Sequence, residues 1–184
     1  MKVNWEVIKS ADGYSEHVPL SMKLLCSSNE DVRDDAYWRL DNSIVLQGYL
    51  FESSFYAVEL ILEILEDKDS VEKENALELL YQIAAGCLGG VQEETMILHH
   101  KEVSVQVAVR EKLIRYYDRI KGVKINHGKP GKSVLNHPLA DPETGIYVAD
   151  SEAEILEIII EVLDDLKIES EKDPRTLPMR YLIY

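Results

Sequence analysis

The sequence is poor in cysteine, glycine and proline, and these shortages exclude several classes of protein. Two cysteines, Cys26 and Cys87, are too few for a disulfide framework, so we expect both thiols to be reduced and buried in the core of a cytoplasmic protein. Nine glycines and six prolines in 184 residues are too few for a collagen-like or linker-rich chain. Hydrophobic residues make up 46% of the chain, which is enough for the core of one domain.

Long hydrophobic runs are also missing. The longest strongly apolar run, residues 158–160, lies between Glu157 and Glu161, so we expect no transmembrane span. The first 25 residues include acidic side chains and Pro19 and have no apolar stretch that fits a signal peptide. These features predict a cytoplasmic protein without a membrane partner.

Basic residues are scarce relative to acidic ones. The chain has 20 Lys and Arg against 34 Asp and Glu, a net charge of −14. Such a protein is repelled by nucleic-acid phosphates and by anionic membranes, whereas a basic protein partner is favoured. The charge is also segregated, because residues 29–94 carry −12, residues 101–132 carry +6 and residues 141–173 carry −10.

Helical periodicity dominates the pattern of apolar residues. Ala36, Leu40 and Ile44 recur at intervals of four, which places them on one face of a helix. Ser151 followed by Glu154 has the spacing of a capping box at a helix start. The same reasoning predicts five helices, over residues 31–47, 53–67, 70–86, 103–120 and 151–167.

These helices predict an all-α fold in one domain, residues 1–184, built as antiparallel helix pairs stacked side by side like a HEAT or armadillo α-solenoid. The loop 122–150 holds four glycines and three prolines, and a loop of this length in a compact domain is often functional. Residues 123–125 and 146–148 within it could pair as a short β-ribbon. The tail 172–184 ends in an apolar segment that we expect to dock on the domain.

The sequence predicts no catalytic residue, metal or cofactor. His99 and His100 are adjacent, and on a helix adjacent side chains point about 100° apart, so they do not readily share a metal. The stretch 128–133 is similar to a phosphate-binding loop, but Asn126 stands where that motif needs glycine. We therefore expect a protein that is not an enzyme; the competing hypothesis is a small enzyme with its site in the loop 122–150.

A stripe of acidic side chains on the second expected helix is the sharpest candidate site. Its members recur at steps of four, three, four and three residues, and are Glu52, Tyr56, Glu59, Glu63 and Glu66. Like charges at these spacings disfavour an isolated helix, and no lysine relieves them. The stripe is either a solvated face or a surface for a cationic partner with Tyr56 as an aromatic anchor. Asp34, Trp38 and Asp41 form a similar stripe on the preceding helix, where Trp38 could equally belong to the core.

Residues 29–66 resemble a segment of bacterial HEAT-like repeat proteins. In that family a Trp-x-x-x-Asn-Ile-like helix end is followed by a His-Gln-Gly-Thr turn, a Tyr-Glu-Ala-Thr-Ala helix start and an Ala-Val-Pro-Phe-Leu run. The matching residues, in order, are Trp38, Asn42, Ile44, Gln47, Gly48, Phe51, Glu52, Ala57, Val58, Leu60 and Leu62. The chain departs from the family at Leu46, Tyr49, Ser53, Ser54 and Glu59.

The resemblance implies an immunity protein, or antitoxin, that binds and neutralises a cognate toxin domain, as in polymorphic-toxin and contact-dependent growth inhibition systems. It also implies that Gln47, Gly48 and Glu52 brace the helix pair. Many such toxins are nucleases, whose substrate clefts are basic, so an acidic helical surface suits them. The alternative is a HEAT-like scaffold for other cellular proteins without a toxin partner.

Overall fold

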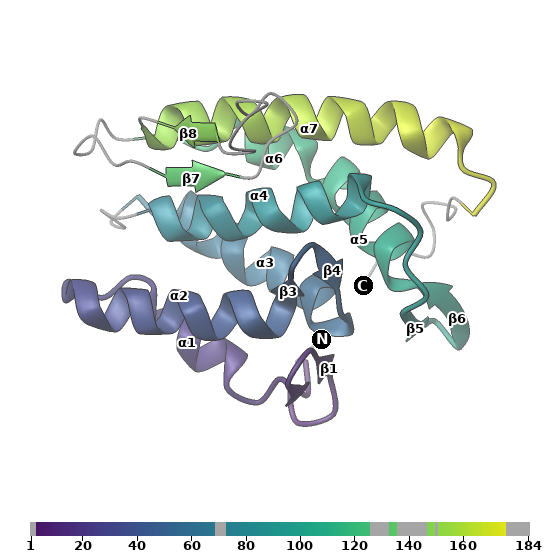
Figure 1. The fold of residues 1–184 in the computed structure, drawn as a ribbon, viewed down its shortest axis with the longest axis horizontal. Coiled ribbons are helices and arrows are strands. Elements are labelled where there is room, and N and C mark those ends of the chain that lie inside the picture. The colour runs from purple at the N-terminus through teal and green to yellow at the C-terminus, as the bar shows by residue number, and fades with distance from the viewer. Residues whose placement is uncertain (1–2, 69–72, 126–132, 136–146, 150, 176–184) are drawn as a thin grey trace.

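The structure, a computed structural model, describes residues 3–68, 73–125, 133–135, 147–149 and 151–175. Its central element is helix α4 (Glu74–Leu88), which contacts α2 (Glu30–Ile44), α3 (Glu52–Glu66), α5 (Val105–Arg115) and α7 (Glu152–Lys172). In Figure 1, α7 lies along one side of α4 and α2 along the other. A mostly helical fold, as the sequence predicts, is therefore confirmed.

The shorter elements surround this bundle. Helix α1 (Val18–Leu24) packs on α2 and α3, and α6 (Tyr117–Lys121) packs on α5 and α7. Four antiparallel hairpins complete the described residues. They are β1 (Lys9–Ser10) with β2 (Gly13–Tyr14), β3 (Val45–Leu46) with β4 (Tyr49–Leu50), β5 (Thr95–Leu98) with β6 (Lys101–Ser104), and β7 (Ser133–Leu135) with β8 (Tyr147–Ala149).

All five predicted helices are present, with shifted ends. The expected helix 103–120 is divided into α5 and α6 at Tyr116, whose backbone leaves the helical region. The cap predicted at Ser151 is confirmed, because its side chain accepts from Glu154 N at 3.2 Å. Asn29 caps α2 in the same way, accepting from Val32 N at 3.3 Å. The solenoid arrangement and the single-domain boundary stay predictions.

The β-ribbon in the loop 122–150 exists, but its first strand is not the expected one. Strand β8 pairs with β7, in the register Val134 opposite Val148, and not with residues 123–125. The segment 123–125 instead continues from α6, with the N–H of Val123 bonded to the carbonyl of Ile120 at 3.1 Å. Residue 146, most of the loop and residues 176–184 of the tail lie outside the described residues.

Helix α3 is packed between several other helices. It contacts α1, α2, α4 and α5, and these contacts bury the wide apolar arc of its sequence. The fully buried hydrophobic residues on it are Phe55, Ala57, Val58, Ile61, Leu62 and Leu65. Each large side chain buried in this way contributes about 1.5–3 kcal/mol to stability. Cys87 on α4 is buried as expected, but Cys26 is exposed because it lies beyond the end of α1.

The turn between β3 and β4 packs closely on α4. Gln47 and Gly48 occupy this two-residue turn with φ values of 52° and 80°, the left-handed conformation of a tight hairpin. A Cβ atom on Gly86 would lie 2.8 Å from the Gly48 carbonyl oxygen, so only glycine fits there. The Gln92 side chain donates to the carbonyls of both glycines, at 2.9 and 3.1 Å, and so fixes the turn against α4.

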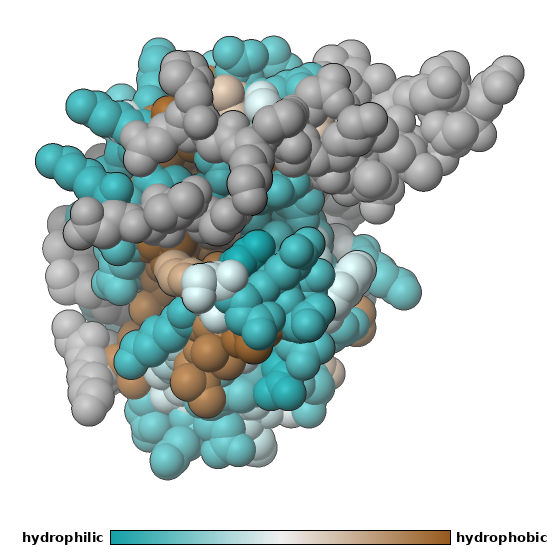
Figure 2. All heavy atoms as spheres, turned by 90° about the vertical axis from the view of Figure 1, so that its left-hand side faces the viewer, coloured by the Kyte–Doolittle hydropathy of each residue, from teal (hydrophilic) through white to brown (hydrophobic). Residues whose placement is uncertain are grey.

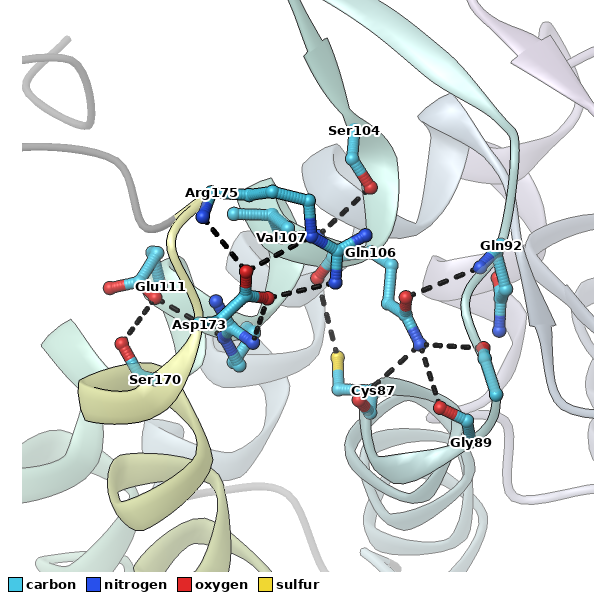
Figure 3. A network of polar contacts seen from close by, with 12 residues as sticks. Cys87, Gly89, Gln92, Ser104, Gln106, Val107, Glu111, Ser170, Asp173 and Arg175 are labelled. Carbon is cyan, nitrogen blue, oxygen red and sulfur yellow. Dashed lines mark hydrogen bonds and ion pairs between the residues drawn. The ribbon is translucent and has the colours of Figure 1, made fainter.

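The carboxyl end of α4 is capped by a side chain from α5. The Gln106 amide nitrogen is within 3.4 Å of the carbonyl oxygens of Cys87 and Gly89, while its oxygen accepts from Gln92 N (Figure 3). Terminal carbonyls of a helix have no partner within the helix, so this cap satisfies groups that would otherwise be buried without hydrogen bonds. Among the described residues, no helix is long and apolar enough to cross a membrane.

Candidate protein-binding surface

The acidic stripe on α3 meets a basic residue of α6. Arg119 donates from Nη1 to Glu59 Oε1 at 3.0 Å, and from Nε and Nη2 to the two carboxylate oxygens of Glu66, both at 2.8 Å. These bonds lower the pKa of Glu66, chiefly through the hydrogen bond from Arg119. The charge expected to face a partner is therefore partly neutralised within the molecule.

The other end of the stripe meets the amino-terminal segment. Tyr56 is half-buried, and its ring packs edge-on against Trp5 with the ring centroids 6.1 Å apart. The Glu52 carboxylate accepts a hydrogen bond from the backbone N–H of Lys9 at 3.2 Å. Glu63, between these contacts, is exposed and forms no ion pair with a described residue.

Beneath the stripe lies a buried lysine. Lys112 Nζ donates to the Phe55 carbonyl at 2.7 Å and sits 4.3 Å from the centre of the Phe55 ring. Burial lowers the pKa of Lys112 to about 8, against the opposing effect of Glu59. The pKa of Glu59 is lowered despite its partial burial, because Tyr116 and Arg119 donate hydrogen bonds to it. Glu59 thus compensates two cations of its own chain.

The second stripe, on α2, is exposed to solvent at Asp34 and Trp38. Asp34 is exposed, and 60% of Trp38 is exposed, so Trp38 belongs to the surface and not to the core. The Trp38 ring packs edge-on against Tyr37, with centroids 5.3 Å apart, which holds the indole in place. Asp41 follows one turn later and is half-buried.

Trp38 and Asp41 lie at a groove between α2, α4 and the β3–β4 turn. The groove has a volume of about 620 Å³. Four aromatic side chains line it (Tyr37, Trp38, Tyr49 and Tyr81), together with the carboxylates Asp41 and Glu78. Tyr49 is 60% exposed, whereas Tyr81 is almost fully buried. No lysine or arginine occurs among the described residues that line the groove.

Two carboxylates, Asp41 and Glu78, lie near the Tyr37 hydroxyl in this groove. Gln82 donates from Nε2 to the Tyr37 hydroxyl at 2.8 Å. Burial raises the pKa of Tyr37, and the nearby carboxylates of Glu78 and Asp41 raise it further. Burial also raises the pKa of Asp41, which a hydrogen bond with Gln82 offsets only in part. A cation in the groove would offset the charge of these carboxylates.

A larger groove, of about 770 Å³, lies between the ends of α4, α5 and α7. Two of its charged groups are paired with each other, since Arg110 bonds to Asp173 at 2.9 Å, and Arg110 also bonds to Glu111 at 3.2 Å. Ser170 donates to Glu111 at 2.6 Å, and Arg175 bonds to Asp173 at 2.8 Å (Figure 3). This network joins the carboxyl end of α7 to α5, so its first role is structural.

Ser43, His17 and Asp12 lie together, the residue types of a catalytic triad, but the serine is in the core. Ser43 Oγ lies 2.8 Å from His17 Nε2 and 3.2 Å from Asp12 Oδ2, but Ser43 is fully buried. The hydroxyl also lies 2.7 Å from the Arg39 carbonyl. The hydroxyl has a single proton for these three neighbours, and the tautomer of His17 decides whether Nε2 donates to the serine or accepts from it. The three side chains join the amino-terminal segment to α2.

The described residues contain no group of three or more His, Cys, Asp or Glu side chains that could hold a metal. Contrary to the expectation from the sequence, His99 and His100 do not lie on a helix. They form the β5–β6 turn, with φ values of 48° and 64°. The histidines of the loop 122–150, His127 and His137, lie outside the described residues.

Figure 2 shows the end of the molecule where α2 and α4 begin, and most of the coloured side chains on this face are hydrophilic. Hydrophilic side chains there surround a smaller hydrophobic area. Among the described residues, Tyr14, Trp38 and Tyr49 are aromatic side chains with exposed rings, and Trp38 and Tyr49 line the same groove.

Sequence reasoning found Trp38 and Asp41 but missed their neighbours. Tyr49 and Glu78 reach the groove from β4 and α4, which are remote from α2 in the sequence. The Gln47–Gly48 pair before Tyr49 is a hairpin signal that could have placed Tyr49 near α2. Nothing in the sequence places Glu78 there. No protein-family model, curated protein or solved structure matches this chain.

Proposed function

We propose that this protein binds a basic protein partner through the face of α2, and that the partner is a toxin domain which it neutralises as an immunity protein. The observation that carries the proposal is the groove beside Trp38, which combines exposed aromatic rings with two carboxylates and has no lysine or arginine among the described residues that line it. The toxin assignment rests on the resemblance of residues 29–66 to HEAT-like immunity proteins.

The physical chemistry of protein interfaces supports this surface. Tryptophan and tyrosine supply large contact areas at little entropic cost, so they dominate binding hot spots. A ring of acidic side chains around them accelerates encounter with a basic partner and excludes acidic ones. Trp38 with Asp34 and Asp41 has this composition, and the net charge of −14 extends the attraction over the whole molecule.

The α3 stripe has a secondary part in the proposal. Glu63 is available to a partner, whereas Glu59 and Glu66 are engaged by Arg119 and Tyr56 is packed on Trp5. A partner's cation would have to compete with Arg119 for these carboxylates. We therefore place the centre of the interface on α2 and its edge on α3.

The same proposal includes a HEAT-like stack. Helices α1 and α2 pack together, as do α3 and α4, and α2 also packs on α3. This order is the one expected of successive helix pairs. In an immunity protein such a stack would be a rigid support for an acidic surface that enters the basic cleft of a nuclease in the cytoplasm.

The test is co-expression with the product of the adjacent gene. We expect a stable complex in purified form, with an affinity that weakens as salt rises, because exposed charges are screened over about 8–10 Å. Growth of cells that express the adjacent protein should be restored by this chain. The absence of both complex and rescue would overturn the toxin assignment, and a complex without toxicity would support the scaffold alternative.

A further inference from the structure

Two exposed apolar side chains lie at the groove of about 770 Å³ between the ends of α4, α5 and α7. Val91, which follows α4, is 76% exposed, and Ile168 on α7 is 51% exposed. Half-buried Leu88 lines the same groove. Apolar groups in a concave surface are stabilised when another apolar segment excludes water from them, so this groove has the shape and the chemistry of a docking site.

The chain leaves the described residues at this same groove. Arg175, the last residue of the described part, lines the groove together with Asp173 and Pro174. The Asp173 carboxylate accepts hydrogen bonds from the backbone N–H of Arg175 at 2.8 Å and from its Nε at 3.0 Å (Figure 3). Asp173 is itself held by the buried Arg110 at 2.9 Å. These bonds fix the point from which the following residues start, at the wall of the groove.

The residues that follow Arg175 have a composition that suits an apolar groove. The sequence from 176 to 184 is Thr-Leu-Pro-Met-Arg-Tyr-Leu-Ile-Tyr, in which six of the nine side chains are leucine, isoleucine, methionine or tyrosine. The one charged side chain in it is Arg180. Helix α7, which forms a wall of the groove, carries eight acidic and two basic residues, so the charge of the segment is complementary to that wall.

We propose that residues 176–184 fold back from Arg175 and pack their apolar side chains into this groove, against Val91 and Ile168. Nine residues span at most about 30 Å when fully extended, so their attachment at the wall of the groove keeps them near it. A segment tethered in this way has an effective concentration in the millimolar range, which favours it over the same segment of a second molecule. The inference gives the expected docking of the tail a specific site, and it does not depend on the toxin assignment.

The experiment is limited digestion of the full chain with trypsin, which cleaves after Arg180 within the segment. A free peptide with the sequence of residues 176–184 is the reference, and mass spectrometry measures the rate of cleavage after Arg180 in both. Proteolysis follows the population of the open form, so a docked segment is cut more slowly than a free one. We expect the parent protein to be cleaved there at least about tenfold more slowly than the peptide.

Variants of exposed residues test whether the groove is the docking site. Ile168→Asn and Val91→Asn each remove an apolar contact from the groove, and Leu20→Asn makes a similar change on α1, where Leu20 is 62% exposed. In Figure 1, α1 lies below α2 whereas α7 lies above α4. The two groove variants should accelerate cleavage after Arg180 by about threefold or more, and Leu20→Asn should not. Cleavage after the buried Lys112 reports global unfolding and should stay slow in every protein.

Cleavage of the parent at the rate of the free peptide would overturn the inference. Equal rates in the groove variants and in Leu20→Asn would also overturn it, because the segment would then be protected at another place. Protection that disappears on dilution would show that a second copy supplies the segment, and would contradict docking within one molecule. None of these results involves the adjacent gene. A protected segment in a protein that forms no complex and gives no rescue would therefore reject the toxin assignment alone.

Discussion

Arg119 on α6 donates two parallel hydrogen bonds of 2.8 Å to Glu66 on α3, one to each carboxylate oxygen. The same guanidinium reaches Glu59 at 3.0 Å. An acidic stripe that looks uniform in the sequence is therefore divided into members that hold the fold and a member, Glu63, that does not.

This division predicts different costs for two equivalent charge reversals. Glu59→Lys would place an ammonium group beside Arg119 and the buried Lys112, so it should lower the free energy of unfolding by about 1 kcal/mol or more. Glu63 is exposed, so Glu63→Lys should change the free energy of unfolding by no more than about 0.5 kcal/mol. Urea denaturation of both variants measures the difference. Equal stabilities would show that the Arg119 bonds contribute nothing.

A second prediction concerns the support of the β3–β4 turn. Gly86→Ala would bring a Cβ to 2.8 Å from the Gly48 carbonyl oxygen, and a backbone atom fixed by Gln92 cannot easily move. We expect a loss of about 1–3 kcal/mol, typical of overpacking. Gly90→Ala is the control, because nothing lies within 4 Å of its Cβ position. Thermal unfolding of the two variants should differ clearly, and similar melting temperatures would contradict the close packing of turn on helix.

The sequence predicts the helices well and the surface poorly, for a physical reason. Ala36, Leu40 and Ile44 follow a local periodicity, and all three are buried as expected. The approach of Arg119 to Glu66, and of Tyr49 to Trp38, depends instead on how distant elements pack. The sequence analysis does not predict the β5–β6 hairpin, because its turn is His99-His100, with positive φ values, and not one of the glycine-containing pairs that mark a two-residue hairpin turn.

A third prediction concerns pH. The pKa of Lys112 is about 8 in the folded protein and 10.5 ordinarily, so below pH 8 the lysine is protonated in both states and the fold carries the full cost of burying its charge. Between pH 8 and about pH 10 the unfolded chain binds more protons, and the contribution of Lys112 to the free energy of unfolding rises with pH.

Lys112→Met should remove this contribution. The buried thiol of Cys87 has a raised pKa and opposes the trend, but it does so equally in both proteins. The free energy of unfolding of Lys112→Met minus that of the parent should therefore decrease as the pH rises from 8 to about 10. Urea denaturation of both proteins at each pH measures this difference. Parallel pH profiles of parent and variant would show that Lys112 is not perturbed by burial.

The central claim is that the face of α2 binds a basic partner, and a pair of variants matched in charge tests it most directly. Asp34→Lys changes the exposed α2 stripe, and Glu157→Lys makes the same change in charge on an exposed position of α7, on the other side of α4 (Figure 1). Dissociation constants of both variants with the product of the adjacent gene are measured by titration calorimetry at low and physiological salt. The account predicts that Asp34→Lys binds about tenfold more weakly than the parent, a loss of about 1.4 kcal/mol in binding free energy, and that Glu157→Lys loses less than about threefold. The difference in affinity between the two variants should become smaller as salt rises. Equal affinities of the two variants, across salt, would contradict it.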